Sequence, residues 1–234
     1  MKGILYLVPA TLGDHDTGST IPDGIRRKVM EIRVFVVENL RSARRYLKML
    51  DRNIAIDQLV FHELNEHTSP EVIPTFLQEL LNGSDAAIIS EAGLPGVADP
   101  GTAMVRLAHE QGIRVVPLTG PSSILLSLMA SGLNGQEFRF HGYLPIKKAE
   151  RKHKIREINA DLKKSGETQI FIEAPYRNDQ LVADLVNTCD PSTMLCIAAD
   201  LTTKSEYIRT QSIGSWKKKF PSLHKRPAIF LLGK

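Results

Sequence analysis

The chain has 234 residues, of which 42% are hydrophobic and 24% charged, and its formal net charge is +4. This balance is typical of a globular protein with a buried core and excludes a low-hydrophobicity disordered chain. The N-terminal apolar run Ile4–Val8 is far shorter than the ~20 residues of a membrane-spanning helix, so we expect a cytoplasmic protein without membrane contact. Cys189 and Cys196 are predicted to be buried thiols, not a disulfide framework.

The charge is distributed unevenly along the chain. Residues 1–118 contain 12 Lys and Arg against 15 Asp and Glu, whereas residues 119–234 contain 18 against 11. The second part therefore carries the whole positive excess, which suits an anionic partner such as nucleic acid. Solvated surface lysines explain the same counts, and both interpretations stay open.

In the first part, short β-type runs alternate with helical patterns. The runs Val34–Val37 and Ala86–Ile89 are apolar throughout, as strands buried on both faces must be. A long helix is expected from Ser69, with Pro70 at its first position and Gly83 at its end. The strands are expected at 3–8, 33–37, 59–62, 85–89 and 113–118, and the other helices at 25–32, 42–50 and 102–111. This alternation predicts a parallel α/β sheet.

After Thr119-Gly120-Pro121 the pattern changes and strands become more frequent. Helices are expected at 122–131, 147–164 and 178–188, and strands at 138–141, 169–172, 194–198, 207–212 and 228–232. We therefore predict two domains: an N-terminal parallel α/β domain at 1–118 and a C-terminal α/β domain at 119–234.

Three turns connect a predicted strand to a helix and carry residues suited to a ligand. The most informative is Ser90–Gly101, where three glycines allow close backbone approach and two prolines stiffen the loop. The others are Pro9–Asp14 and Val116–Ser123. Ligands of open α/β sheets lie at the carboxyl ends of strands, where these turns converge. The alternative is a tight connection in which Asp99 and one of the two serines, Ser122 or Ser123, cap helices.

Other motifs are absent or incomplete. There is no G-x-G-x-x-G and no P-loop, which argues against a dinucleotide or nucleoside triphosphate fold. The run His62–His67 resembles a zinc-protease motif but has Glu66 where the second histidine should stand, so we expect no metal.

Several segments, in order and over nearly the whole chain, resemble the tetrapyrrole-methylase superfamily. The nearest likeness is to its 16S ribosomal RNA cytidine 2′-O-methyltransferase branch. The matching segments are Leu5–Pro9, Glu38–Arg41, Asn65-Glu66, Ser90–Pro95, Asp99–Gly101, Val115–Pro121, Gly142–Pro145, Glu173–Arg177 and Ala199–Thr202. Departures fall on the acceptor side, where Asn39-Leu40, Ala174-Pro175-Tyr176 and Ala199-Asp200 include replacements of the branch's usual residues.

The resemblance implies two α/β domains with S-adenosylmethionine held in a cleft between them, and a homodimer. The implied cofactor-binding residues are Pro9, Ala92, Gly93, Leu94, Val97, Ser122, Ser123, Ile172, Pro227 and Ala228. Leu94 stands where many superfamily members have Asp, so backbone recognition matters more here.

The resemblance also implies methyl transfer to an acceptor hydroxyl, with Glu38, Arg41, Glu173 and Arg177 as candidate catalytic residues. Glu38 or Glu173 would support the hydroxyl, and Arg41 and Arg177 would hold substrate phosphate; structural ion pairs are the alternative. The basic helix 147–164 would contact RNA through the second domain, unless it is only a solvated face.

Three functions remain from the sequence. The first is an S-adenosylmethionine-dependent methyltransferase that acts on a ribose 2′-hydroxyl of ribosomal RNA. The second is a methylase of a tetrapyrrole or another small acceptor. The third is a catalytically weak cofactor-binding module that binds RNA.

Overall fold

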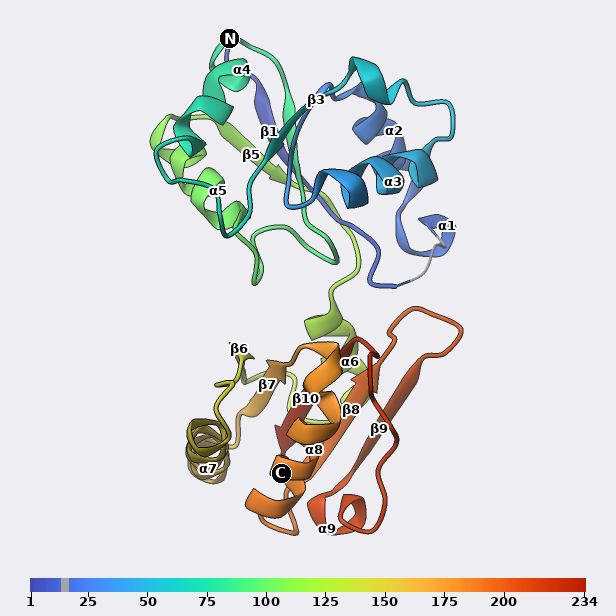
Figure 1. Cartoon of the computed structure of the whole chain (residues 1–234), viewed down its shortest axis with the longest axis vertical. Helices are drawn as coiled ribbons and strands as arrows, with labels where there is room; N and C mark the ends of the chain where they lie inside the picture. Colours follow the sequence, from blue (N-terminus) through green and yellow to red (C-terminus); the bar gives the residue numbers. More distant parts are fainter. Residues whose placement is uncertain (14–16) are drawn as a thin grey trace. The chain divides into compact units, whose positions relative to one another are not determined.

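The computed structural model describes residues 1–13 and 17–234, which form two compact units, Met1–Ser122 and Ser123–Lys234. Figure 1 shows the helices and strands of the two units. The domain limits expected at 118/119 stay a prediction, and Asp14, the end of the first predicted turn, lies outside the described residues.

The first unit is a parallel sheet with helices on both faces, as predicted. Its five strands have the order β3-β2-β4-β1-β5, and all their pairings are parallel. The elements are β1 Ile4–Val8, α1 Thr17–Thr20, α2 Asp23–Glu31, β2 Val34–Val37, α3 Leu40–Leu50, η1 Ile56–Gln58, β3 Val60–Glu63, η2 Ile73–Leu77, α4 Gln78–Leu81, β4 Ala86–Ile89, α5 Gly101–Glu110 and β5 Arg114–Pro117.

Two of the three inner strands, β2 and β4, explain why helices must cover both faces of this sheet. Every residue of β2 and β4 is buried, which confirms the expectation from their unbroken apolar sequences. Alternate residues of the strands enter two cores. One core packs against α2 and α3, and the other against η2, α4 and α5.

The prediction of a long helix from Ser69 is wrong. The chain turns between Ser69 and Val72 and then forms the 3₁₀ helix η2, followed by the single α-helical turn α4. Thr75 N–H donates to the Val72 carbonyl, three residues back, at 2.9 Å. Pro74 explains the difference, because it lacks an N–H and disfavours the α conformation of the residue before it. The expected end is confirmed, since Gly83 has φ +97°.

The second unit contains a mixed sheet with the order β6-β7-β10-β8-β9. Strands β6 and β7 are parallel, and β7, β10, β8 and β9 pair antiparallel in that order. The elements are α6 Ser123–Ser131, β6 Phe138–Tyr143, α7 Lys148–Ser165, β7 Thr168–Ile172, η3 Pro175–Arg177, α8 Asn178–Thr188, β8 Met194–Ala199, β9 Tyr207–Ser212, α9 Ile213–Trp216 and β10 Ala228–Gly233.

The core of the second unit lies between this sheet and the helices α7, α8 and α9. Trp216 is 2% exposed, and its indole N–H donates to the Leu195 carbonyl at 2.8 Å. Cys189 and Cys196 are free and buried, as expected. Burial raises the pKa of the Cys189 thiol to about 12 and raises the pKa of Cys196 as well.

Candidate functional site

The carboxyl ends of three neighbouring strands lie level in the first unit. Val8 of β1 and Val37 of β2 both pair with Ile89 of β4. The residues that follow these strands are Pro9, Glu38 and Ser90, so they emerge side by side at one sheet edge. This is the edge at which open α/β sheets bind ligands.

Three turns meet at this edge. Ala10 and Gly93 exchange two backbone hydrogen bonds, of 2.8 and 3.2 Å, which join the turns after β1 and β4. A Cβ on Gly120, after β5, would overlap the ring of Pro9, so the third turn packs directly on the first. Tyr46 of α3 is buried and donates to the Pro9 carbonyl at 2.5 Å. The convergence predicted for these turns is therefore present within the first unit.

Gly120→Ala tests whether this packing shapes the ligand site. The added methyl group cannot fit against Pro9, so the first turn must move. We expect the dissociation constant for S-adenosylhomocysteine, measured by calorimetry, to rise at least about tenfold, or about 1.4 kcal/mol. The control is Gly24→Ala in α2, where a Cβ meets nothing within 4 Å and alanine favours the helix. Equal affinities in both variants would contradict the role of the contact.

Asp99 joins two points of the loop from β4 to α5. Its Oδ1 accepts hydrogen bonds from the N–H groups of Gly96 and Gly101, each at 2.8 Å. Asp99 thus binds the N–H of Gly101, the first residue of α5, although the N-cap position of the helix is Pro100, one residue later than the sequence placed it. Ala98 has φ +60°, an unusual backbone conformation that is often found at ligand sites.

The predicted cofactor residues of this loop differ in exposure. Gly93 is buried in the contact with Ala10, Leu94 is half-buried, and Ala92 and Val97 are exposed. A Cβ on Gly96 would meet nothing within 4 Å, so the backbone there faces open space. The loop thus offers space at Gly96, whose N–H and carbonyl are bonded to Asp99 and Thr102, beside the apolar side chains of Leu94 and Val97.

An open hollow of about 730 Å³ lies beside this loop, and we call it the acidic hollow. Four carboxylates line it, together with neutral residues and one histidine: Glu38, Asn39, Asn65, Glu66, His67, Glu91, Ala98, Asp99, Pro100 and Thr102. The sequence indicated Glu38 and, in the turn Ser90–Gly101, Glu91. It did not indicate that Glu66 and His67, which follow β3, line the same hollow. The level register of β2, β3 and β4 is the signal that brings them together.

Glu38 is the most perturbed carboxylate of the acidic hollow. Burial raises the pKa of its carboxyl, an accepted hydrogen bond from the Glu91 N–H opposes this, and the charges of Glu91 and Asp99 raise it further. Glu91 itself accepts a hydrogen bond from the Ser42 hydroxyl at 3.2 Å. A half-buried carboxyl with a raised pKa beside a hollow can accept a proton from a substrate.

Arg41 does not face Glu38 as a paired residue. It is exposed on the first turn of α3 and lines a neighbouring hollow of about 370 Å³ with Asn39, Leu40, Arg44 and Glu63. Asn39 lines both hollows and caps α3 by accepting a hydrogen bond from the Ser42 N–H at 3.0 Å. Arg41 thus lies beside the hollow that shares Asn39 with the acidic hollow, and its role stays a prediction.

The second unit has its own edge where predicted residues gather. Ile172 of β7 pairs with Ile229 of β10 and with Tyr143 of β6, and Ala228 pairs with Ala199 of β8. Ile172 and Ala228 are half-buried, and Pro227 is exposed. The three predicted cofactor residues of this unit after Ser123 therefore share one sheet edge.

Glu173 and Arg177 form a tight ion pair at this edge. Glu173 Oε1 accepts from Arg177 Nε at 2.9 Å and Nη2 at 2.5 Å, and from the Ala174 N–H at 2.7 Å. The Glu173 side chain is 0% exposed. The bond to Glu173 raises the pKa of Arg177. The structural ion pair that the sequence left open as an alternative to catalytic roles is therefore present for Glu173 and Arg177.

Sequence reasoning missed a second ion pair on the same edge. Arg226 Nε donates to Asp200 Oδ2 at 2.7 Å, and Asp200 has φ +52°. Thr202 and Lys225 nearby also have positive φ, so three such non-glycine residues cluster at this edge. The departure from the family pattern at Ala199-Asp200 was the only sequence signal for it.

Ser122 and Ser123 mark the division between the two units. Ser122 ends the first unit, and Ser123 is the first residue of α6 in the second. Both are half-buried.

Within residues 1–13 and 17–234, no group of three or more His, Cys, Asp or Glu side chains is arranged to hold a metal ion. His62, from the incomplete zinc motif, instead bonds Glu79 at 3.1 Å and stacks on Phe76. None of the helices in the described part of the chain has the length and hydrophobicity needed to cross a bilayer.

The sequence model for Tetrapyrrole (Corrin/Porphyrin) Methylases matches residues 26–216. The chain belongs to this family. A relative from Buchnera aphidicola, named Ribosomal RNA small subunit methyltransferase I, is 30% identical across 98% of this chain and 78% of its own length. A relative of the same name from Streptococcus pyogenes is 34% identical across 91% of this chain and 69% of its own.

Solved structures of tetrapyrrole methylases share the fold. The methyltransferase CobJ has a TM-score of 0.65 at 15% identity and covers 99% of this chain and 94% of its own. Uroporphyrin-III C-methyl transferase from Thermus thermophilus, complexed with S-adenyl homocysteine, has a TM-score of 0.58 at 17% identity, with 99% and 98% covered. This tetrapyrrole methylase is thus an S-adenosylmethionine-dependent methyltransferase built from two α/β domains.

The first-unit edge of this tetrapyrrole methylase suits that cofactor. A nucleoside with an amino-acid tail needs apolar contact, which the 46% exposed side chain of Val97 supplies, and room beside the backbone, which Gly96 supplies. The cleft expected between the domains stays a prediction.

Proposed function

We propose that this methyltransferase methylates a ribose 2′-hydroxyl of small-subunit ribosomal RNA. The names of its relatives support the RNA substrate. The observation that carries the chemistry is Glu38, a half-buried carboxyl with a raised pKa on the wall of the acidic hollow.

We assign the cofactor contacts as the resemblance implies them. Pro9, Ala92, Gly93, Leu94, Val97 and Ser122 would act from the first unit, and Ser123, Ile172, Pro227 and Ala228 from the second. When bound, S-adenosylmethionine supplies a methyl group on a positively charged sulfur that leaves as a neutral thioether. The residues that hold it therefore serve mainly to align this group with the acceptor, which contributes about 7–11 kcal/mol in favourable cases.

Glu38 is the general base in this proposal. Its carboxylate takes the proton of the ribose 2′-hydroxyl while the oxygen forms its bond to the methyl carbon and the carbon–sulfur bond breaks. A base of raised pKa is better matched to neutral pH than an ordinary carboxylate. Glu173 is the weaker candidate, since Arg177 and the Ala174 N–H engage its Oε1 and its side chain is buried.

Arg41 and Arg177 are proposed to hold substrate phosphate. Arg41 is exposed, and no carboxylate in the described ranges 1–13 and 17–234 forms an ion pair with it. Glu173 holds the guanidinium of Arg177 in place through its Nε and Nη2. The remaining N–H groups of this guanidinium would bind a phosphate oxygen.

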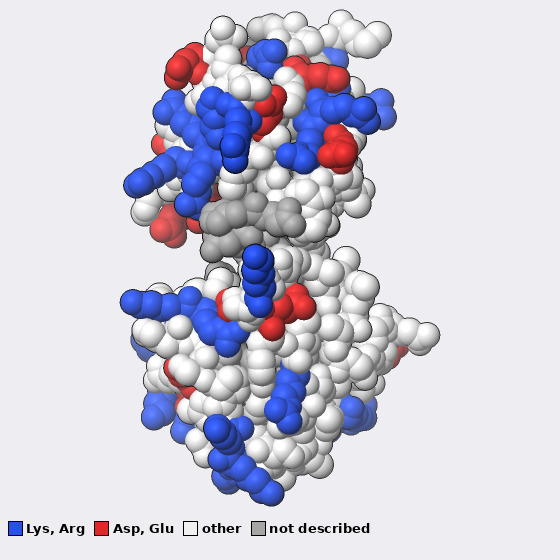
Figure 2. All heavy atoms as spheres, turned by 90° about the vertical axis from the view of Figure 1, so that its right-hand side faces the viewer, with Lys and Arg blue, Asp and Glu red and all other residues white. Residues whose placement is uncertain are grey.

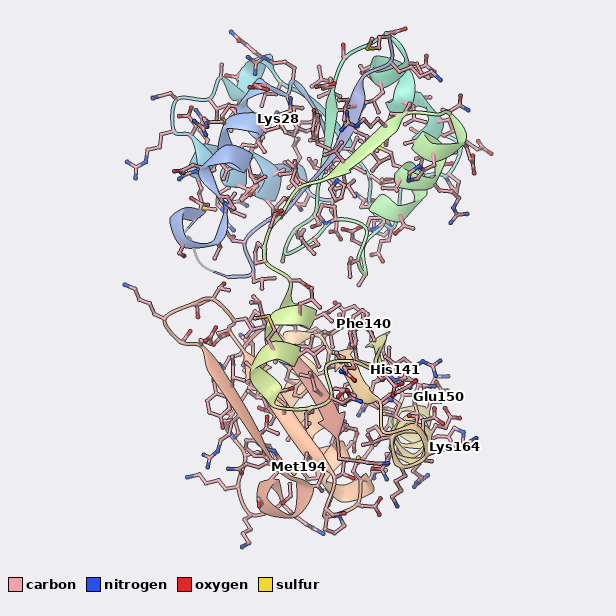
Figure 3. The ribbon with its side chains drawn as sticks, turned by 180° about the vertical axis from the view of Figure 1, so that it is seen from behind. Lys28, Phe140, His141, Glu150, Lys164 and Met194 are labelled. Carbon is pink, nitrogen blue, oxygen red and sulfur yellow. The ribbon has the colours of Figure 1, made fainter. Side chains whose placement is uncertain are left out.

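We propose that the basic second domain contacts the RNA backbone through α7. Figure 3 labels Glu150 in the first turn of this helix and Lys164 in its last turn. Arg151 is excluded from this surface, because it is 1% exposed and bonded to Asp184. The helix side chains left without an ion pair among the described residues include Lys148, Lys152 and Arg156.

We also propose a homodimer in the cytoplasm. The family resemblance predicts the dimer, and the exposed apolar side chains Met129 and Ile146 offer contact area. Buried free thiols suit a reducing compartment. Light scattering at known concentration measures the assembly, and a monomer mass would overturn the dimer.

The test of the function uses small ribosomal subunits from a strain that lacks the gene. Incubation with the protein and tritiated-methyl S-adenosylmethionine should label the RNA at one nucleotide, mapped as a 2′-O-methyl mark absent from the deletion strain. Label in a tetrapyrrole and none in RNA would favour a small-acceptor methylase. Calorimetric binding of the cofactor with no transfer to any RNA would favour a binding module.

A further inference from the structure

Helix α3 of the first unit has one fully basic face. Arg41, Arg44, Arg45 and Lys48 recur at helical spacing and are all exposed, while Ala43, Tyr46, Leu47 and Leu50 are buried. The helix contains no acidic residue. At 1.5 Å per residue these four cations cover about 10 Å of the helix axis. We call them the α3 face.

Arginines of the α3 face keep their charge free for a partner. In the part of the chain that the structure describes, Arg41, Arg44 and Arg45 form no ion pair with any carboxylate. Arg44 lies over the ring of Phe61 at 5.4 Å, which orients it without neutralising it. Lys48 is engaged differently, since it donates to the carbonyls of Arg52 and Ile54.

Cations elsewhere are more often neutralised by neighbours. On α7, Lys147 pairs with Glu150, and Lys154 pairs with Glu157. On α2, Lys28 pairs with Glu31 at 3.0 Å and lies over the Tyr6 ring; Figure 3 labels it. The net charge of each part of the chain therefore does not show which of its cations are paired.

The α3 face also adjoins the proposed site of chemistry. Arg41 and Arg44 line the smaller hollow, which shares Asn39 with the acidic hollow that contains Glu38. Figure 2 shows Lys and Arg atoms gathered on the face of the first unit that bears α2 and α3 in Figure 1. A phosphate held by Arg41 or Arg44 would thus lie next to a ribose placed at Glu38.

We propose that the α3 face binds the sugar–phosphate backbone of the RNA substrate on either side of the methylated nucleotide. The inference rests on the proposed RNA substrate and names the surface that holds it. Arg41 and Arg44 take the phosphates nearest the acceptor ribose, and Arg45 takes one further along the strand. Guanidinium groups suit this role, because their planar N–H pairs match phosphate oxygens.

The test measures binding of a fluorescein-labelled single-stranded RNA 20-mer of mixed sequence by anisotropy over a range of salt concentrations. Each phosphate that the protein no longer neutralises should reduce the slope of log affinity against log salt by about 0.7. Arg45→Glu should show this reduction, and Arg44→Glu with Arg45→Glu should reduce the slope by about 1.4. With small subunits as substrate, KM should rise and kcat should stay unchanged.

The matched control is Arg106→Glu, the same charge change on α5, which packs on the opposite face of the sheet. Its slope should equal that of the unaltered protein. Calorimetric binding of S-adenosylhomocysteine should be equal in all variants, which shows that they are folded. Equal slopes for Arg45→Glu and Arg106→Glu would overturn the α3 face as the RNA surface.

The two proposals fail in different ways. RNA binding that depends on the α3 face, without methyl transfer to any RNA, would overturn the proposed function and uphold the surface. Full transfer with an unaltered KM and slope in the double variant would overturn the surface and uphold the function.

Discussion

Glu38→Gln is expected to lower the rate of methyl transfer by about 10²–10⁴-fold, the usual contribution of a general base. The amide keeps the size of the carboxyl and can still accept the hydrogen bond from the Glu91 N–H, so the hollow should keep its shape. Single-turnover transfer to small ribosomal subunits measures the loss. Cofactor affinity, measured by calorimetry, should be unchanged.

A matched control for Glu38→Gln is Glu110→Gln, an exposed glutamate at the end of α5. Its transfer rate should match that of the unaltered protein. If Glu38→Gln also transfers at the full rate, Glu38 is not the base. A full rate for Glu38→Gln with a large loss for Glu173→Gln would move that role to Glu173.

The pH profile gives an independent test of the same group. A base works as the carboxylate, so kcat/KM falls as pH drops through the pKa of Glu38. Burial and the charges of Glu91 and Asp99 raise this pKa, which places the acid limb above that of an ordinary glutamate. Glu91→Gln removes one of these charges and should shift the limb to lower pH. A shift to higher pH would contradict the assignment.

The sequence predicts the sheet of the first unit because burial on both faces requires unbroken apolar strands. Val34–Val37 and Ala86–Ile89 have this pattern and form the two inner strands that are buried at every residue. The segment after Ser69 shows the limit of periodicity. Ile73, Phe76, Leu77 and Leu80 are buried as the spacing requires, yet Pro74 changes the helix type.

The candidate site is predictable where it depends on local chain geometry. Gly93 and Gly120 mark close backbone contacts, and both occur in turns that the sequence singled out. Contacts between distant segments are harder to predict. Glu66 and His67 line one wall of the acidic hollow, and Arg226 donates to Asp200. The local sequence pattern predicts neither contact.

The counts of charged residues in the two parts of the chain do not show which cations are accessible, because a count does not separate a buried cation from an exposed one. Arg151 lies in the most basic stretch of the chain, yet it contributes nothing to the surface. The first part of the chain has more acidic than basic residues, yet α3 presents three arginines without ion pairs among the described residues.

Arg151→Met is expected to destabilise the second unit by about 3–5 kcal/mol, the usual loss when one partner of a buried ion pair is removed. Arg151 donates to Asp184 Oδ2 at 2.9 and 2.7 Å and to the Ile146 carbonyl at 2.7 Å. The variant leaves the Asp184 carboxylate, which is 4% exposed, without its cation. Urea unfolding followed by Trp216, the single tryptophan, reports on this unit.

Two further variants separate this buried ion pair from other effects of lost charge. Lys163→Met, on the same helix, breaks an exposed pair with Asp190 and should cost about 0–1 kcal/mol. Arg151→Met with Asp184→Leu removes both buried charges and should recover most of the loss, because no carboxylate is left unpaired.

If Arg151→Met weakened RNA binding without lowering stability, Arg151 would belong to the RNA surface. A stability loss with RNA binding intact assigns it to the packing of α7 on α8.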